Sequence, residues 1–488
     1  MNPAFLKGAT WGFPNASVDH IETHAAHVFL VVDRAFKIKK PVKLPYLDFS
    51  TVEKRRAVLA RELEINRAYA PDIYITLADK LGEPVLVMER FDTRAILSAK
   101  VIRGIDDALA NDLAQMAAEA HAVSRPAAVP GHAIMRGLEA QLNQAFAASP
   151  DLFPAAEAKT FKDRYAALLR RAAPLLDRRS TMGLVRRCHG DMHCGNIAVI
   201  DGKPALFDAI EFSEKIATID VLYDLGFLLM DLLRHRQRRA ANIVLNRYLH
   251  LRRSEEDLTG LEALPLFLAM RAGVRALVTA DLVRELPVPH SFRQRGEARD
   301  YFRAALSFLD PSEARLVCVG GLSGTGKSTI SASLAPGIGA PPGAIHIRSD
   351  IERKVMAGIA ETGRLASESY TPEASEKVYQ QVIRRAEAAL AAGHSVILDA
   401  VFARPRERSA VEALARKHGA RFNGLWLEAP PRMLRTRLDA RRLDASDADA
   451  AVLERQLGYD LGEIGWRRMD VSGTPEDAVT AAREGIEA

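Results

Sequence analysis

Gly321-Leu322-Ser323-Gly324-Thr325-Gly326-Lys327-Ser328 follows the apolar run Leu316-Val317-Cys318-Val319 and precedes a helix-like segment. The stretch satisfies the spacing G-x-x-x-x-G-K-[ST] at every fixed position. In this arrangement, backbone N–H groups of the turn and of the helix N-terminus surround a phosphate. We therefore expect a nucleotide-binding loop in which Lys327 reaches the β- and γ-phosphates and Ser328 binds Mg²⁺. The loop residues predicted to bind are Gly321, Ser323, Gly324, Thr325, Gly326, Lys327, Ser328 and Thr329.

The segments after this loop alternate between strand-like and helix-like patterns. Strands are expected at 315–320, 344–348, 395–398 and 423–428, and helices from 327, at 350–358 and at 372–392. Such alternation predicts a parallel sheet with helices on both faces, an α/β domain. Asp310-Pro311 is the predicted boundary before it.

Acidic and basic residues after these strands supply candidate catalytic groups. Asp350 lies just past a strand with Arg353 one helical turn later, where they would bind an acceptor. Asp399 ends the apolar strand Val396-Ile397-Leu398 and would help to hold Mg²⁺. Arginines that would stabilise charge on a transferring phosphoryl group cluster in a predicted helical lid: Arg435, Arg437, Arg441 and Arg442, of which Arg437 is assigned to nucleotide binding.

A second phosphate-handling motif, His189-Gly190-Asp191-Met192-His193-Cys194-Gly195-Asn196, occurs earlier in the chain. Two apolar runs flanking Asp201-Gly202-Lys203 follow it and predict a hairpin. This hairpin would bring Asp208 almost opposite Asn196, giving two oxygen ligands for Mg²⁺. Asp191 would accept the proton of an acceptor hydroxyl.

The preceding residues supply a cation for the phosphates. Residues 27–39 predict a hairpin with its turn at Asp33-Arg34, followed by a charged helix at about 51–69, a strand at 85–88 and a helical region from about 103 to 178. Lys37 would contact the α- and β-phosphates and Glu62 would orient it. Lys39 points to the same strand face as Lys37, so the choice between them stays open, with Lys37 preferred.

Residues 15–305 resemble the aminoglycoside phosphotransferase family of kinase-like enzymes. The resemblance lies in His189-Gly190-Asp191-x-His193-x-x-Asn196, in Leu206-Phe207-Asp208, and in Asp220 and Asp224, which match the family's structural acids. Residues 312–480 resemble the small P-loop kinases. Together these resemblances imply an α+β bilobal kinase-like domain at 1–310 and an α/β P-loop domain at 311–488. They also imply a bifunctional ATP-dependent phosphotransferase that uses Mg²⁺ and acts on hydroxyl groups of small molecules.

Other interpretations account for less of the sequence. Zinc binding by Cys188, His189, His193 and Cys194 lacks a second ligand pair at suitable spacing. A protein kinase would need a glycine-rich loop and an A-P-E motif, which we do not find. The guanine-specifying motif N-K-x-D is absent, which favours ATP. One alternative stays open, in which the P-loop domain is a regulatory ATP switch for a single kinase.

Composition and charge narrow the range of possible partners and cellular compartments. The chain has 488 residues, a net charge of +5 and three cysteines, and we see no signal peptide or membrane span, so a cytoplasmic protein is expected. We see no basic aromatic groove for nucleic acid. Residues 234–303 contain 14 arginines, no lysine and 8 acidic residues, which favours a neutral or anionic acceptor over a polycation. The sequence indicates neither the exact acceptor nor the oligomeric state.

Overall fold

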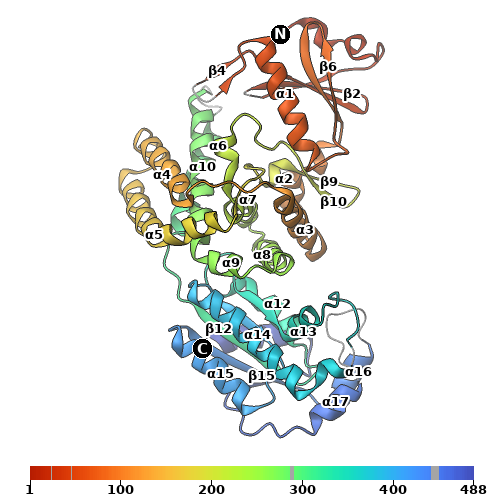
Figure 1. Ribbon diagram of the computed structural model, residues 1–488, viewed down its shortest axis with the longest axis vertical. Helices are drawn as coiled ribbons and strands as arrows, with labels where there is room; N and C mark the ends of the chain where they lie inside the picture. Colours follow the sequence, from red (N-terminus) through yellow and green to blue (C-terminus); the bar gives the residue numbers. More distant parts are fainter. Residues whose placement is uncertain (24, 45–46, 286–290, 366, 441–449, 488) are drawn as a thin grey trace. The chain divides into compact units, whose positions relative to one another are not determined.

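The computed structural model describes residues 1–488 except 24, 45–46, 286–290, 366, 441–449 and 488. The chain forms two compact units (Figure 1). Unit 1 comprises Met1–Leu251 and Leu266–Ser307, and unit 2 comprises Arg252–Pro265 and Phe308–Ala488. The short segment Arg252–Pro265 therefore groups with unit 2, although unit 1 supplies the chain on both sides of it.

Unit 1 begins with a five-stranded antiparallel sheet in the order β1-β2-β3-β7-β6. Its strands are β1 (Asp19–Glu22), β2 (Ala26–Val31), β3 (Arg34–Lys39), β6 (Tyr74–Lys80) and β7 (Glu83–Glu89), and β4 (Lys43–Leu44) pairs separately with β5 (Leu47–Asp48). The 3₁₀ helices η1 (Pro3–Leu6) and η2 (Gly8–Trp11) pack Phe5 and Trp11 on one sheet face. Helix α1 (Val52–Arg67), capped by Thr51, packs against β6 and β7. Strand alternation turns Phe36 and Ile38 into the Trp11 core and Lys37 and Lys39 away from it.

The hairpin at residues 27–39 forms, but its turn lies one residue earlier than predicted. Val31 pairs with Arg34, so the turn residues are Val32 and Asp33. Arg34 also pairs with Glu89 of β7, which extends β3 by one residue. Val32 adopts a φ of 53°, which is unfavourable for a β-branched residue. The pairing of β3 on both edges therefore outweighs the local preference of Val32.

The rest of unit 1 is mainly helical. Its helices are α2 (Leu97–Lys100), α3 (Asp107–Val123), α4 (Gly131–Ala147), α5 (Ala155–Thr181), α6 (Glu214–Ala217), α7 (Val221–Arg234), α8 (Arg238–Arg252), α10 (Leu264–Glu285) and α11 (Phe292–Ser307), with short 3₁₀ turns η3 (Thr93–Ala95), η4 (Val101–Arg103) and η5 (Cys194–Asn196). Two small antiparallel pairs, β9 (Ile197–Ile200) with β10 (Lys203–Leu206) and β8 (Val185–Arg187) with β11 (Thr218–Asp220), carry the second motif. The helical region expected at about 103–178 is interrupted between α3 and α4 and again between α4 and α5.

Unit 2 contains a five-stranded parallel sheet in the order β13-β14-β12-β15-β16. Its strands are β12 (Arg315–Gly321), β13 (Ile345–Arg348), β14 (Val396–Asp399), β15 (Arg421–Glu428) and β16 (Arg467–Asp470). Its helices are α9 (Glu255–Thr259), α12 (Lys327–Leu334), α13 (Ser349–Met356), α14 (Pro372–Ala391), α15 (Pro405–Lys417), α16 (Pro431–Asp439), α17 (Ala450–Leu457) and α18 (Pro475–Glu487). Three short 3₁₀ helices complete the unit: η6 (Gly260–Ala263), η7 (Ala335–Gly337) and η8 (Ser367–Tyr370). Helices α12 and α18 share one core with the sheet, built on Val317, Val319 and Ile397. Helices α14 and α15 contact the sheet and each other. The predicted fold class is confirmed for both units.

No described helix is long and apolar enough to cross a bilayer. Cys188, Cys194 and Cys318 are buried free thiols.

Candidate active sites

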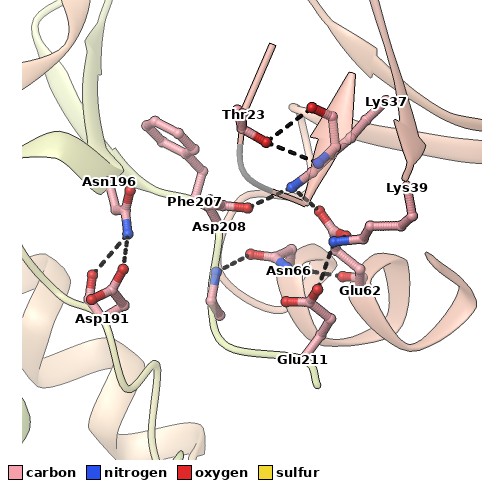
Figure 2. Close-up of polar contacts among 12 residues, drawn as sticks. Thr23, Lys37, Lys39, Glu62, Asn66, Asp191, Asn196, Phe207, Asp208 and Glu211 are labelled. Atoms are coloured by element: carbon pink, nitrogen blue, oxygen red, sulfur yellow. Dashed lines mark hydrogen bonds and ion pairs between the residues drawn. The ribbon is translucent and has the colours of Figure 1, made fainter. Parts of the chain in front are cut away.

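The first candidate site centres on an ion-pair network that joins β3, α1 and the segment after β10 (Figure 2). The Lys37 Nζ atom lies 2.6 Å from Glu62 Oε1 and 2.7 Å from Asp208 Oδ1. Burial alone would lower the pKa of Lys37, but the carboxylates of Asp208 and Glu62 raise that pKa well above its ordinary value. Burial would likewise raise the pKa of Glu62, but Lys37 and Lys39 lower it. Burial would also raise the pKa of Asp208, but Lys37 lowers it. Lys37, Glu62 and Asp208 are therefore all charged at neutral pH.

Lys39 contacts the same glutamate from the other side. Its Nζ atom lies 2.7 Å from Glu62 Oε2 and 2.6 Å from Glu211 Oε1. Lys37, in contrast, is the lysine that reaches Asp208. Glu211 was not among the sequence-predicted site residues, because no local pattern marks a lone glutamate after the hairpin.

Asp191 and Asn196 meet across the loop that precedes β9, apart from the lysine network in Figure 2. Asn196 Nδ2 donates to Asp191 Oδ2 at 2.8 Å and to the Asp191 carbonyl at 3.0 Å. This orientation leaves the Asn196 side-chain oxygen for another ligand. Burial would raise the pKa of Asp191, but the neighbouring His193 lowers that pKa well below the usual range. Asp191 is therefore a carboxylate at neutral pH.

The β9–β10 hairpin places Asn196 beside Asp208 as predicted from the turn sequence. Asp201 and Gly202 adopt φ values of 50° and 81°, the left-handed turn expected of Asp-Gly. The Phe207 N–H donates to the Asn196 carbonyl at 2.9 Å, which brings the next residue, Asp208, level with Asn196. Two side chains with oxygen atoms suited to Mg²⁺ thus lie at the same end of the hairpin, Asn196 just before β9 and Asp208 just after β10.

Buried acids hold the Asp191 loop in shape. Asp224 accepts the backbone N–H groups of His189 at 3.2 Å and Gly190 at 3.0 Å. Asp220 instead forms a buried double hydrogen bond with Arg179, at 2.7 and 2.8 Å. Arg271 of α10 donates to the Gly190 carbonyl at 3.0 Å, a contact that sequence patterning did not reveal.

These side chains open into a cavity of about 470 Å³. Lys37, Lys39, Asp191 and Asp208 line it together with apolar residues such as Met88 and Phe207. The β1–β2 loop closes one side through Thr23, whose hydroxyl lies 3.0 Å from both the N–H nitrogen and the carbonyl oxygen of Ala26. This loop contains no glycine, which explains why sequence patterning did not find a phosphate loop there.

The second candidate site surrounds the glycine-rich turn of unit 2. Gly321 and Gly324 adopt φ values of 139° and 85°, and a Cβ atom at either position would come within 3.0 Å of a backbone carbonyl oxygen. These positions therefore require glycine. Lys327 begins α12, and its Nζ atom donates to the Leu322 carbonyl at 3.1 Å.

Ser328 and Asp399, each predicted from the sequence to hold Mg²⁺, are in contact. The Ser328 hydroxyl donates to Asp399 Oδ2 at 2.5 Å. Burial would raise the pKa of Asp399, but His346 and Arg348 lower it to about 2. The pair thus presents a hydroxyl and a carboxylate, both suitable oxygen ligands for Mg²⁺.

Predicted acceptor residues lie in the same cavity as the glycine-rich turn. This cavity measures about 380 Å³ and is lined by Lys327, Ser328, Asp350 and Arg353, together with Ser323, Gly324, Gly326 and Thr329. Arg353 donates to the Ser369 carbonyl at 2.6 Å and lies over the ring of Tyr370. The lining also includes Tyr379, Arg404, Arg455 and Gln456. Gln456 accepts the Ser323 N–H at 2.8 Å.

Of the predicted lid arginines, the two that the structure describes, Arg435 and Arg437, do not line this cavity. Arg437 donates to the carbonyl of Val471 at 2.7 Å and does not line the cavity. Its position on α16 turns it toward the end of β16, so the geometry does not support nucleotide binding by Arg437. Arg435 pairs with Glu454 at 2.6 Å, whereas Arg441 and Arg442 lie outside the described residues.

Comparison with known proteins identifies the two domains. Residues 29–264 match the model of the phosphotransferase enzyme family, and residues 316–459 match that of an AAA domain. Uncharacterized proteins of Mycobacterium tuberculosis and Mycobacterium bovis are each 30% identical over 501 aligned residues, covering 95% of this chain and 94% of theirs.

Some solved structures are similar to part of the chain, with low TM-scores. A choline/ethanolamine kinase family protein of Mesorhizobium loti is 16% identical, with a TM-score of 0.37, and covers 60% of this chain and 92% of its own. A gluconokinase of Sinorhizobium meliloti is 20% identical, with a TM-score of 0.27, and covers 36% of this chain and 92% of its own. On the similarity to its mycobacterial relatives over nearly the full chain, it belongs to their family, in which a phosphotransferase-family domain is followed by an AAA-type P-loop domain.

Proposed function

We propose that the protein is a bifunctional ATP-dependent phosphotransferase with one kinase site in each unit. The observation that carries this proposal is that each unit has its own cavity in which phosphate-binding and acceptor-binding groups converge. Lys37, Asp208 and Asp191 line the first cavity, and Lys327, Asp350 and Arg353 line the second. A protein with one active site would need only one such set.

In the first site, Lys37 would bind the α- and β-phosphates while Glu62 fixes its position. Asp191 would then take the proton of the acceptor hydroxyl as that oxygen attacks the γ-phosphate. Its low pKa makes it a weak base, so its main contribution is to orient the hydroxyl. This is adequate because phosphoryl transfer depends mostly on positioning and charge stabilisation.

In the second site, the backbone of the turn and Lys327 would enclose the phosphates, and Asp350 would orient the acceptor hydroxyl. Arg353 would stabilise negative charge on the acceptor or on the transferring group. The regulatory alternative, in which unit 2 only switches unit 1, does not call for Asp350 and Arg353 beside the phosphate-binding lysine.

Both sites fit Mg²⁺, a hard cation that prefers oxygen ligands. Asn196 and Asp208 would hold it in unit 1, and Ser328 and Asp399 in unit 2. The fit rests on the free side-chain oxygen of Asn196 and on the hydroxyl–carboxylate pair of unit 2. Bound there, the cation would neutralise phosphate charge.

The acceptor of the first site is proposed to be a neutral or anionic hydroxyl compound, such as a sugar or sugar acid. Beside the Asp191 loop, α10 contributes Arg271, bonded to Gly190, and Arg275. The guanidinium groups of Arg234 and Arg275 lie 4.1 and 5.5 Å from the ring centre of Tyr301. A polycationic acceptor would be repelled by these arginines.

The test is a mass-shift screen of hydroxyl compounds with ATP, run on the full chain and on two knockouts. Asp191→Ala should remove one set of phosphorylated products, and Asp350→Ala should remove another or the product of a consecutive step. If Asp350→Ala changed no product, while Asp191→Ala removed all of them, unit 2 would be the regulatory switch instead.

A further inference from the structure

The ion pairs of the first site form a chain of alternating charges rather than a single lysine–glutamate pair. In order, the chain runs Asp208, Lys37, Glu62, Lys39, Glu211, and each contact measures 2.6 or 2.7 Å (Figure 2). Both ends, Asp208 and Glu211, belong to the segment that follows β10. Both lysines belong to β3, and the central glutamate belongs to α1.

Solvent exposure divides this chain into two halves. The Asp208 side chain is 46% exposed and that of Lys37 13%, so this half faces the cavity where phosphates would bind. Side chains of Lys39 and Glu211 are only 5% and 7% exposed, and Glu62 is fully buried. Lys39 and Glu211 also border this cavity, but they expose far less side-chain surface to a ligand than Asp208 does.

Further contacts tie α1 to the same segment. Asn66 Oδ1 accepts the Ala209 N–H at 2.8 Å, and its Nδ2 donates to the Glu62 carbonyl at 3.0 Å. The Asp208 N–H donates to the Tyr74 hydroxyl at 3.0 Å. Helix α1 and the Asp208 segment are thus joined by both ion pairs and neutral hydrogen bonds.

We propose that Lys39 and Glu211 are positioning residues that lock Glu62 in place, so that the first site is assembled before nucleotide binds. This inference rests on the proposed function of that site. In many protein kinases, the lysine–glutamate pair forms only when the glutamate's helix is moved into position. Here the second lysine holds Glu62 without any such movement.

The electrostatic reason is that Lys39 limits how strongly Lys37 is attracted to the carboxylates of the network. Removing one partner from a buried ion-pair network leaves an uncompensated charge, which is strongly unfavourable. Without Lys39, the Lys37 ammonium would be the remaining cation for three carboxylates, those of Glu62, Asp208 and Glu211. It would be drawn into them and away from the phosphates. Lys39 would thus affect nucleotide binding through Lys37.

A double-mutant cycle tests this mechanism. Calorimetry would measure the Kd of Mg²⁺ and the ATP analogue AMP-PNP in a Lys327→Ala background, so that only the first site responds. Lys39→Met should weaken binding ~10- to 100-fold, as is usual for residues that orient direct ligands. Lys39→Arg should restore most of it. Lys37→Met with Lys39→Met should bind no more weakly than Lys37→Met alone, because Lys39 acts through Lys37.

Lys54→Met is the control, because Lys54 lies on α1, the helix that carries Glu62, but pairs with Asp48 at the surface. If Lys39→Met unfolds the protein, Glu211→Gln, which keeps the side-chain volume, should weaken binding in the same direction. Additive effects of the two lysine substitutions, or unchanged binding in both Lys39→Met and Glu211→Gln, would overturn the inference. No AMP-PNP binding with Lys39 and Glu211 intact would instead overturn the proposed function of the first site, and the inference with it.

Discussion

The two sites hold their proposed phosphate-binding groups by different physical means. In unit 1, side chains from distant parts of the chain meet: Lys37 and Asp208 are 171 residues apart. In unit 2, one contiguous turn supplies most of the site, and Lys327 bonds to a carbonyl only five residues away. The first site therefore depends on tertiary packing and charge balance, whereas the second depends on local backbone conformation.

This difference predicts where each site is vulnerable. Substituting one charged residue in unit 1 leaves a buried partner uncompensated, so the damage should spread through the network. In unit 2, a side chain added at Gly324 would meet the Leu434 carbonyl oxygen at 2.9 Å and strain the backbone directly.

The largest expected effect comes from the reacting group of the first site. Asp191→Ala should lower phosphotransfer by unit 1 about 10²- to 10⁴-fold, the usual cost of losing a positioned base. Nucleotide affinity should change little, because Lys37, Asn196 and Asp208 remain. Steady-state rates and calorimetry on the same variant would check both statements. Wild-type turnover would remove Asp191 from the mechanism.

The next effect concerns stability and tests the role of packing in unit 1. Arg179 and Asp220 form a buried double hydrogen bond, so Arg179→Ala should lower the free energy of unfolding by about 3–5 kcal/mol. Arg239→Ala removes a half-exposed partner of Asp107 and should cost less than about 1 kcal/mol. Denaturant titrations of the two variants would measure the difference, and equal losses would contradict this account.

The next expected effect is smaller and concerns how the stability of unit 2 depends on pH. Burial lowers the pKa of His394, whose ring Nε2–H donates to the Gly343 carbonyl at 3.0 Å. An unfolded chain binds a proton there below pH 6.5 that the folded unit 2 does not, so stability should fall as pH falls from 7 to 5. His394→Gln should reduce that slope.

First-site charges should behave differently over the same range. The pKa of Lys37 is raised and that of Glu62 is lowered, so this pair stays intact between pH 5 and 8. AMP-PNP affinity of the first site, measured in the Lys327→Ala background, should therefore vary little. A steep loss of affinity below pH 6.5 would show that another group controls the site.

The smallest expected effect is that of Arg437 in unit 2, and Arg353 of the same unit provides the contrast. Arg437→Ala should leave second-site turnover within about 2-fold of wild type, because it bonds to carbonyls away from the cavity. Arg353→Ala should lower turnover ~10²-fold or more, since Arg353 lines the cavity beside Asp350. Steady-state kinetics in an Asp191→Ala background would measure both, and similar losses would mean that Arg437 reaches the nucleotide after all.

The contrast between the units also explains what the sequence could reveal. The P-loop and the Asp-Gly hairpin each place their groups through local backbone geometry, so Ser328 and Asp208 could be predicted from spacing. Glu211, Arg271 and Gln456 could not, because each acts on a segment far away in the sequence. The hairpin turn at Val32 was predicted one residue too late for a similar reason. Its position depends on the pairing of β3 with β7, a contact between segments far apart in the sequence.

The central claim is that the units carry two independent nucleotide sites, and calorimetry with Mg²⁺ and AMP-PNP tests it most directly. The wild-type chain should bind two equivalents. Lys327→Ala and Asp208→Ala should each bind one, with the remaining affinity unchanged, because neither substitution alters the other cavity. A single equivalent in the wild-type protein, or loss of both on one substitution, would contradict the claim.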